Sequence, residues 1–186
     1  MKNFIKGIFA FIFFLYATVG LGQSITHSKQ FKDEFLKRIN HTRQTGCNCG
    51  STYMPPAPPL VWNNQLEIAA FGHAKDMSRK NYFSHTAQDG KSMQQRIVLA
   101  GYNFRGYRSF TVGENIAQGQ QNIAVVMQGW FKSEGHCKNL MNAAFKEVGV
   151  AAYNLYWVQD FGGRDPFSPE QQKLIKSGRY RLIKED

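Results

Sequence analysis

The sequence predicts an α+β fold with an antiparallel sheet. Amphipathic helical patterns come first along the chain, and the two clearest strands, residues 147–153 and 155–161, follow one another late. Asn154 separates these strands, which predicts a hairpin. Because helices and strands do not alternate, the pattern favours an antiparallel sheet over parallel βαβ units.

The first expected helix covers about residues 30–43. Phe31, Phe35 and Ile39 recur at helical spacing with charged residues between them,. The segment that follows, TGCNCGSTYMPPAPPLVW, is rich in glycine, cysteine and proline. Since these residues do not continue a helix, the segment is predicted to be an extended loop.

A second helix is expected to begin at an asparagine cap, Asn63 or Asn64, and to end at Asn81,. His73 falls on its apolar face. A single histidine in that position is more often a hydrogen-bonded core residue than a metal ligand. A short helix over residues 92–100 is then predicted.

The second half of the chain is predicted to contain a short strand and further helices. The strand covers residues 112–117, and the helices cover residues 122–132 and 138–144. Residues 163–186 are polar and basic and are interpreted as a C-terminal extension, with one helix near residues 169–177.

The length and the net charge of the chain limit the classes of function that it can have. The chain has 186 residues, which suggests one domain, and its 23 basic and 13 acidic residues give a formal charge of +10,. The basic residues are spread along the chain and no nucleic-acid-binding motif is present,. We therefore expect no specific nucleic-acid partner.

The N-terminus has the three-part pattern of a secretory signal peptide. Lys2 and Lys6 precede an apolar run over residues 8–21, and the small residue Gly22 ends the pattern,. The run is shorter than the roughly 18 residues that a membrane-spanning helix needs. We predict a signal peptide over residues 1–22, no transmembrane anchor after its removal, and a secreted or periplasmic protein. The alternative is that the segment stays attached as an uncleaved anchor.

Export places the three cysteines in an oxidising compartment, where disulfides persist. Cys47 and Cys49 are too close in sequence to pair comfortably with each other. The predicted bridge therefore joins Cys137 to Cys47 or Cys49, and it stabilises the fold by about 4–5 kcal/mol in the chain-entropy description. The third cysteine remains as a free thiol, a partner for a second molecule, or a reserve ligand. A zinc site of the C-x-C type lacks a second cysteine pair here.

Two histidines and two glutamates are the candidate site: His85, Glu114, Glu134 and His136. Divalent metals such as zinc accept both imidazole nitrogen and carboxylate oxygen. Glu134 and His136 are two residues apart, and a continuous helix would direct them to nearly opposite sides. Both reach one cleft only if the helix breaks between them, which Gly135 would permit. In the alternative interpretation the glutamates cap helices or pair with lysines.

Several segments resemble the CAP superfamily, which comprises the cysteine-rich secretory, antigen 5 and pathogenesis-related-1 proteins and is also called the SCP domain. The resemblance is to its compact bacterial secreted members and covers about residues 31–162. The matching segments are, in chain order, YFSH (82–85), GENIA (113–117), WFKSEGH (130–136) and YWVQDFG (156–162).

This resemblance implies a three-layer α-β-α sandwich with a central antiparallel sheet over residues 23–162, and a large open cleft. It implies that His85 and His136 are the two cleft histidines, which ligate a divalent metal, often zinc. Glu114 matches the first cleft glutamate and Glu134 the second. The long loop that separates the second glutamate from the second histidine in eukaryotic members is absent here.

The resemblance leaves two functions open. In the first, the protein is a binding module whose cleft holds a lipid, a cell-wall component or another extracellular ligand. The sequence contains no recognisable nucleophile motif, which favours this interpretation. The alternative is a metal-dependent, protease-like hydrolase, in which a metal on His85 and His136 activates water and Glu114 or Glu134 takes its proton.

Overall fold

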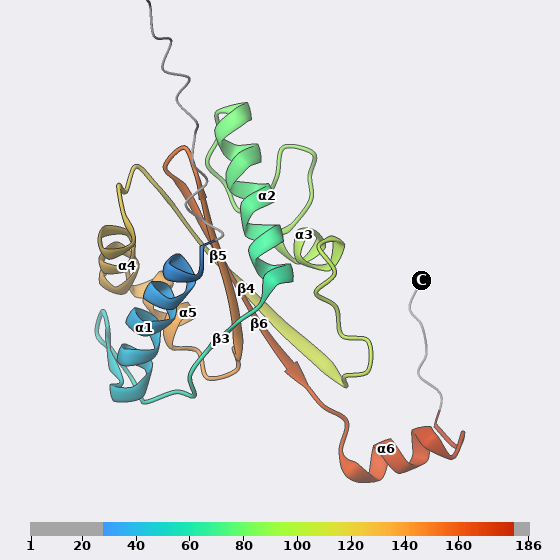
Figure 1. The fold of residues 1–186 in the computed structure, drawn as a ribbon. Helices are drawn as coiled ribbons and strands as arrows, with labels where there is room; N and C mark the ends of the chain where they lie inside the picture. Colours follow the sequence, from blue (N-terminus) through green and yellow to red (C-terminus); the bar gives the residue numbers. More distant parts are fainter. Residues whose placement is uncertain (1–27, 181–186) are drawn as a thin grey trace, which may run out of the picture.

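A computed structural model describes residues 28–180 as a four-stranded sheet between two helical layers. Helices α1, α4 and α5 cover one face of the sheet, and α2 and α3 cover the other (Figure 1). The predicted α+β sandwich is confirmed. The predicted signal peptide, residues 1–22, lies outside the described residues.

The sheet has the strand order β3-β5-β6-β4. Strands β5 (Glu147–Tyr153), β6 (Tyr156–Asp165) and β4 (Ser109–Gln118) pair antiparallel. Strand β3 (Val61–Trp62) adds a parallel edge to β5. Two residues carry no periodic pattern, so β3 was absent from the sequence prediction. Strand β4 forms the opposite edge, where the candidate site lies.

The β5–β6 hairpin turns over two residues, not one. Asn154 and Leu155 both have positive φ, 47° and 65°, as a tight hairpin turn of the primed type requires,. Leu155 was predicted to lie in the strand; it lies in the turn instead and is 40% exposed. Strand β6 is buried along nearly its whole length, because helices cover both faces of the sheet,.

The first helical layer consists of α1 (Lys29–Thr45), α4 (Ile123–Lys132) and α5 (Glu134–Met141). Its core against the sheet is largely aromatic, and burying each such side chain stabilises the fold by roughly 1.5–3 kcal/mol. The large aromatic residues of this core are Phe31, Phe35, Trp130, Phe145, Trp157 and Phe161.

The second layer consists of α2 (Asn64–Lys80) and α3 (Met93–Leu99). Asn63 caps α2 by accepting from the backbone of the first turn, and Asn81 ends it in the left-handed conformation with φ 54°,. Both ends agree with the sequence prediction.

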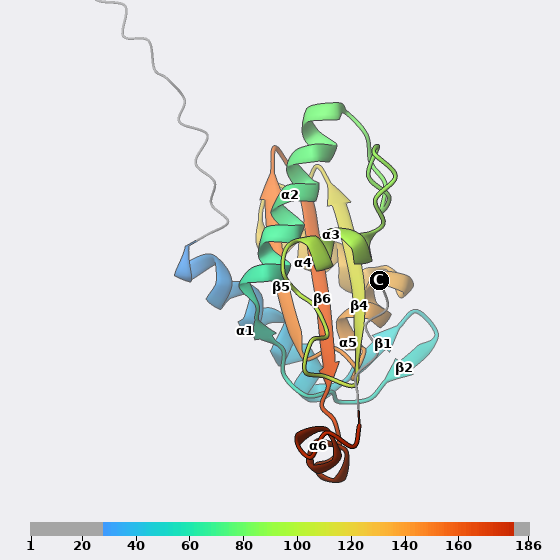
Figure 2. The ribbon, with the colours of Figure 1, turned by 90° about the vertical axis from the view of Figure 1, so that its right-hand side faces the viewer.

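The cysteine-rich segment is not a plain extended loop. It forms an antiparallel hairpin of β1 (Cys47–Cys49) and β2 (Thr52–Met54), which lies at the α5 end of the molecule (Figure 2). A disulfide joins Cys49 to Cys137 on α5. This confirms that Cys137 pairs with one of the two neighbouring cysteines and leaves Cys47 as a free thiol.

Arg43, the last buried residue of α1, connects three segments at this end of the molecule through hydrogen bonds. Its guanidinium is fully buried and donates to the carbonyl oxygens of Pro58 and Leu140, both at 2.7 Å. It also donates to the carbonyl oxygens of Asn142 and Phe145. One side chain therefore connects α1, the proline-rich loop and the α5–β5 connection.

The chain leaves the sheet after β6. Helix α6 (Pro169–Lys176) has no buried residue and projects away from the sheet (Figure 1). It confirms the helix predicted in the basic tail. Within the described part of the chain, no helix is long and apolar enough to cross a bilayer.

Candidate functional site

Glu114 is the centre of the candidate site. It lies on β4, is only 6% exposed, and has both carboxylate oxygens occupied. One oxygen is 2.8 Å from His85 Nδ1, and the other accepts from the Arg96 guanidinium at 2.6 Å. The structure therefore brings together two of the four predicted residues, His85 and Glu114, and adds Arg96.

The loop that carries His85 is held from two sides. His73 on α2 bonds through Nε2 to the carbonyl oxygen of Ser84 at 2.8 Å. Arg96 on α3 donates to the carbonyl oxygen of His85, also at 2.8 Å. His73 is 1% exposed, which confirms the prediction of a hydrogen-bonded core histidine.

A second buried carboxyl group lies beside Glu114. Asp160 on β6 is the register partner of Glu114 and is 1% exposed. Burial, and after it the Glu114 carboxylate, raises the pKa of Asp160 well above its ordinary value. Burial alone would raise the pKa of Glu114 as well, but the hydrogen bond from His85 and the charge of Arg96 lower it. The lowered pKa favours the ionised form of Glu114, and the raised pKa favours the protonated form of Asp160.

His136 approaches β4 from the other helical layer. It lies in the first turn of α5, and its carbonyl oxygen accepts from Asn115 Nδ2 at 3.2 Å. Asn139, one turn later, donates to the carbonyl oxygen of Glu114. Burial and the charge of nearby His85 lower the pKa of His136, so its imidazole is neutral at physiological pH,.

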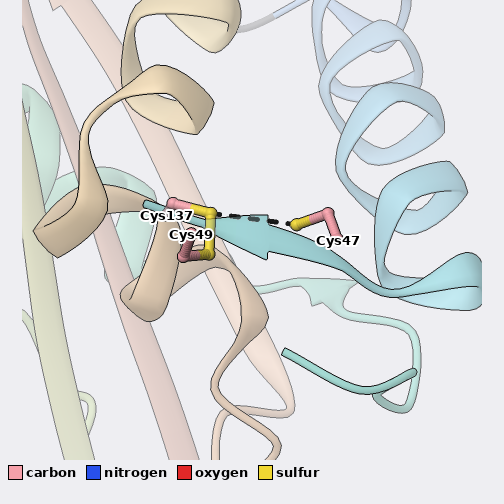
Figure 3. A group of neighbouring side chains, drawn as sticks. All are labelled: Cys47, Cys49 and Cys137. Atoms are coloured by element: carbon pink, nitrogen blue, oxygen red, sulfur yellow. Dashed lines mark hydrogen bonds between the residues drawn. A yellow bond between two sulfur atoms is a disulfide. The ribbon is translucent and has the colours of Figure 1, made fainter. Parts of the chain in front are cut away.

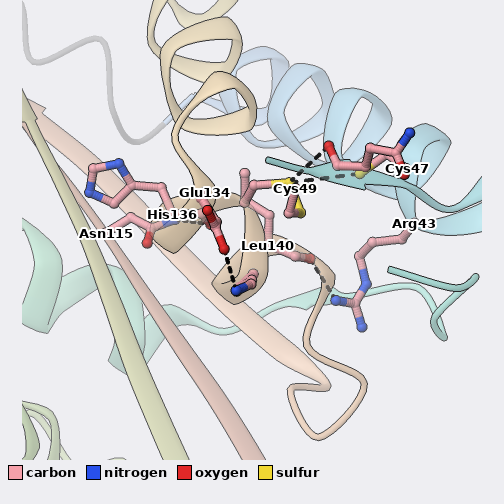
Figure 4. The surroundings of a disulfide bond; sticks show 10 residues. Arg43, Cys47, Cys49, Asn115, Glu134, His136 and Leu140 are labelled. Carbon is pink, nitrogen blue, oxygen red and sulfur yellow. Dashed lines mark hydrogen bonds and ion pairs between the residues drawn. A yellow bond between two sulfur atoms is a disulfide. The ribbon is translucent and has the colours of Figure 1, made fainter. Parts of the chain in front are cut away.

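Glu134 does not join this group. The predicted helix break at Gly135 is wrong: the helices separate at Ser133, and α5 contains both Glu134 and His136. Glu134 pairs with Lys138 at 2.6 Å. It packs over the β1–β2 turn, where a Cβ on Gly50 would lie 2.7 Å from its carboxylate. Figure 4 shows the Glu134 and His136 side chains pointing in different directions.

The imidazole nitrogens of His85 and His136 are of the donor type that a divalent metal accepts. Because His85 Nδ1 faces the Glu114 carboxylate, its Nε2 is left for a ligand, and this carboxylate–imidazole arrangement is typical of metal-binding histidines. His136 supplies a second imidazole, and its lowered pKa favours the neutral form that metals bind,. Both oxygens of Glu114 are hydrogen-bonded and Glu134 is turned away, so neither presents an unbonded oxygen to the histidines.

Among residues 28–180, three or more metal-binding side chains converge only at Cys47, Cys49 and Cys137, whose ligand atoms lie within 4.8 Å of one another. Two of these sulfurs form the disulfide. This cluster could hold a metal only after reduction, and it is separate from the histidines.

A concave feature lies away from Glu114. A pocket of about 750 Å³ opens between the first turns of α1 and α4 and the β5–β6 turn. Its apolar lining includes Phe31, Ile123, Ala152, Leu155 and Trp157. None of the four predicted site residues lines it, and the sequence analysis did not predict it, because its walls come from four separate elements.

Arg96 and Asp160 were also missed. Arg96 lies on a short helix whose pattern carries no special signal. Asp160 did carry one, since it is an acid within the otherwise uncharged strand YWVQDF. A buried acid in such a run must either pair with a cation or be protonated.

Residues 36–161 match the family described as CAP, the cysteine-rich secretory protein family. Together with the three-layer fold and the His85–Glu114 pair, this match shows that the chain belongs to the CAP family.

Two relatives from Bacillus subtilis are similar in sequence. The uncharacterized membrane protein YlbC is 34% identical over 102 residues, and the uncharacterized protein YkwD is 34% identical over 108 residues. The matches cover 55% and 57% of this chain but only 28% and 40% of those two proteins. The chain thus corresponds to less than half of either relative.

Solved structures agree with the fold. An extracellular SCP-domain protein from Bacillus anthracis is 30% identical with a TM-score of 0.55, over 72% of this chain and 41% of that one. An outer surface protein from Borrelia burgdorferi has a TM-score of 0.58 at 20% identity, over 74% of this chain and 95% of that one. The second likeness concerns the fold alone.

Proposed function

We propose that this chain is an exported binding module of the CAP family, with a two-histidine metal site and a separate apolar ligand pocket. His85 and His136 would hold a divalent cation such as zinc. The positions that these two residues leave open are available to water or to a polar group of an extracellular ligand. Export is supported by the signal-peptide pattern at residues 1–22 and by the extracellular similar protein.

The observation that carries this proposal is the state of the glutamates. A hydrolase needs a carboxylate that can take a proton from metal-bound water. Both oxygens of Glu114 are occupied, by His85 and Arg96, and its pKa is lowered. Glu134 pairs with Lys138 and faces the hairpin. No free base lies beside the imidazoles among these candidates, which supports binding over catalysis.

The apolar pocket supports a ligand with a hydrocarbon part, such as a lipid. Ligand pockets of this size are mostly apolar with a few polar groups that orient the ligand. Here Phe31, Ile123 and Trp157 supply apolar walls, and Asn122 and Asn154 supply polar groups at the rim. A lipid is therefore favoured over a purely polar cell-wall fragment.

The test is a crossed binding experiment. Zinc is titrated by calorimetry, and a fluorescent long-chain fatty acid by fluorescence. A His85→Ala, His136→Ala double variant is expected to lose zinc and keep the fatty acid. Leu155→Asp is expected to weaken fatty-acid binding and to keep zinc binding, because it places a charge at the apolar pocket. The fold should be kept, because Asp tolerates the left-handed conformation of this turn position.

Two results would contradict the proposal. The first is loss of both ligands in both variants while circular dichroism shows that the variants are folded, because the two sites would then not be separate. Zinc-dependent cleavage of a labelled protein substrate that disappears in Glu114→Gln would favour the hydrolase instead.

A further inference from the structure

The three cysteines form a sulfur cluster that the proposed binding function does not use. Cys49 and Cys137 are both fully buried and are joined by the disulfide. The free Cys47 thiol is half-buried, and its sulfur lies 3.8 Å from that of Cys137 (Figure 3). This separation is van der Waals contact between two sulfur atoms.

The C-x-C spacing explains the cluster. In a strand, residues i and i+2 point to the same face, so β1 directs both Cys47 and Cys49 to one side,. That side faces Cys137 on α5. The intervening Asn48 is exposed and pairs with Tyr53 across the hairpin. Either β1 sulfur is therefore in reach of the same α5 sulfur, while the two cannot comfortably bond to each other.

We infer that this cluster is a thiol–disulfide exchange site in which Cys47 is the entry point to the buried Cys49–Cys137 pair. Its substrate class is a disulfide carried by another molecule, small or protein. Access is the reason: thiol–disulfide exchange requires contact between the reacting sulfurs, and of the three only Cys47 is exposed to any degree,.

The internal step needs no outside oxidant. The Cys47 thiolate attacks the Cys137 sulfur, a Cys47–Cys137 bond forms, and the Cys49–Cys137 bond breaks. Cys49 leaves as a thiolate and takes up a proton equivalent to the one that Cys47 released. One disulfide and one thiol are present before and after the step.

Oxidation of the reduced chain follows the same route inward. The Cys47 thiolate attacks an external disulfide R–S–S–R, which forms a Cys47–S–R mixed disulfide and releases one R–S⁻. The Cys137 thiolate then attacks the Cys47 sulfur and releases the second R–S⁻. Finally the Cys49 thiolate attacks Cys137 and returns Cys47 to a free thiolate. The external disulfide is reduced to two thiols, and the buried thiol pair is oxidised.

The first test measures the rate of oxidation with oxidised glutathione as the probe. The full chain is reduced and then allowed to re-form its disulfide, and samples are quenched with acid. Cys47→Ser should close the Cys49–Cys137 bond roughly tenfold or more slowly than the wild type, because buried thiols then react only after local opening. Asn48→Ser, which alters the exposed residue between the two cysteines, is the matched control and should keep the wild-type rate. Equal rates in Cys47→Ser and wild type would overturn the inference.

The second test maps the disulfide pairing itself. Burial raises the pKa of the Cys47 thiol, so the oxidised wild type is incubated without denaturant at about pH 9 to increase the minor fraction of thiolate,. After acid quenching, peptide fragmentation at Asn48 distinguishes the two pairings. A Cys47–Cys137 fraction should appear, and Cys49→Ser should form this bond completely. If only Cys49–Cys137 is found in the wild type and Cys49→Ser folds with two free thiols, the exchange does not occur. If Cys49→Ser does not fold, the oxidation rates of the first test decide.

Discussion

Glu114 and Asp160 are paired residues on β4 and β6, and the carboxyl groups of both are buried next to each other. Only one of them can be ionised at low cost, because two like charges in a buried site repel each other. The contacts of Arg96 and His85 with the Glu114 carboxylate stabilise its ionised form. Asp160 is left as the neutral acid.

Asp160→Asn should therefore stabilise the protein at neutral pH. The pKa of Asp160 is raised in the folded state, so between about pH 4 and that raised pKa the unfolded chain loses a proton that the folded chain keeps,. Wild-type stability falls over this range, by up to about 1.4 kcal/mol per pH unit for this group. The asparagine amide does not ionise, so this loss of stability with rising pH is absent from the variant.

The measurement is urea unfolding of both proteins across this pH range. The free-energy advantage of Asp160→Asn should grow as the pH rises from about 4. A constant difference, or a loss that increases with pH, would mean that Asp160 is ionised in the folded protein.

Glu114→Gln should weaken both the proposed metal site and the fold. It leaves the mostly buried Arg96 guanidinium without its carboxylate, which we expect to cost about 3 kcal/mol,. It also removes the carboxylate that fixes the His85 tautomer, which lowers metal affinity by roughly 10–100-fold.

Glu134→Gln is the matched control for this change. Glu134 is a half-exposed member of an i,i+4 pair with Lys138, and such surface pairs contribute about 0.5 kcal/mol or less,. Unfolding and zinc titration of both variants separate the two glutamates. Equal losses in the two variants would show that Glu134 belongs to the site after all.

Local signals in the sequence predicted both ends of α2 and the start of α3, whereas the helix predicted at residues 138–144 is α5 at residues 134–141. Asn63, Asn81 and Ser92 act on backbone groups within a few residues of themselves, so a single sequence contains the whole interaction,. The pairing of His85 with the Glu114 region came from the family motifs. Periodicity alone gives no relation between residues 29 positions apart.

The remaining features depend on contacts that no local pattern encodes. The β1–β2 hairpin has three-residue strands, too short for a recognisable alternation. The direction of Glu134 depends on the helix break at Ser133, one residue before the glutamate and not one after it. The partnership of Arg96 with Glu114 joins a helix to an edge strand through the tertiary fold.

Arg43→Met should strongly destabilise the protein. The substitution removes the donor from four carbonyl oxygens, and the bonds to two of them, Leu140 and Phe145, are buried. An unsatisfied buried polar group costs about 1–3 kcal/mol. Because methionine partly fills the same space and some carbonyls can find water, we expect a net loss of about 3–5 kcal/mol. Urea unfolding measures this loss, and Arg38→Met on the exposed side of α1 serves as control. Similar unfolding midpoints for the two variants would show that the hydrogen bonds of Arg43 to the carbonyl oxygens contribute little to stability.

Gly149→Ala and Gly129→Ala should change stability in opposite directions. A Cβ at Gly149 on β5 would lie 2.0 Å from the backbone nitrogen of Glu67, so α2 would have to move away from the sheet. We expect a loss of at least about 2–3 kcal/mol, as for overpacking against rigid backbone. Gly129 lies inside α4 with nothing within 4 Å of a built Cβ, and alanine there should stabilise by about 0.5–1 kcal/mol,.

Thermal unfolding of the two variants separates the effect of the close approach of α2 to β5 from the general effect of replacing a glycine. A stable Gly149→Ala variant would mean that α2 does not pack on β5 in this way. That packing also sets the position of the loop that begins at Asn81 and carries His85 toward Glu114.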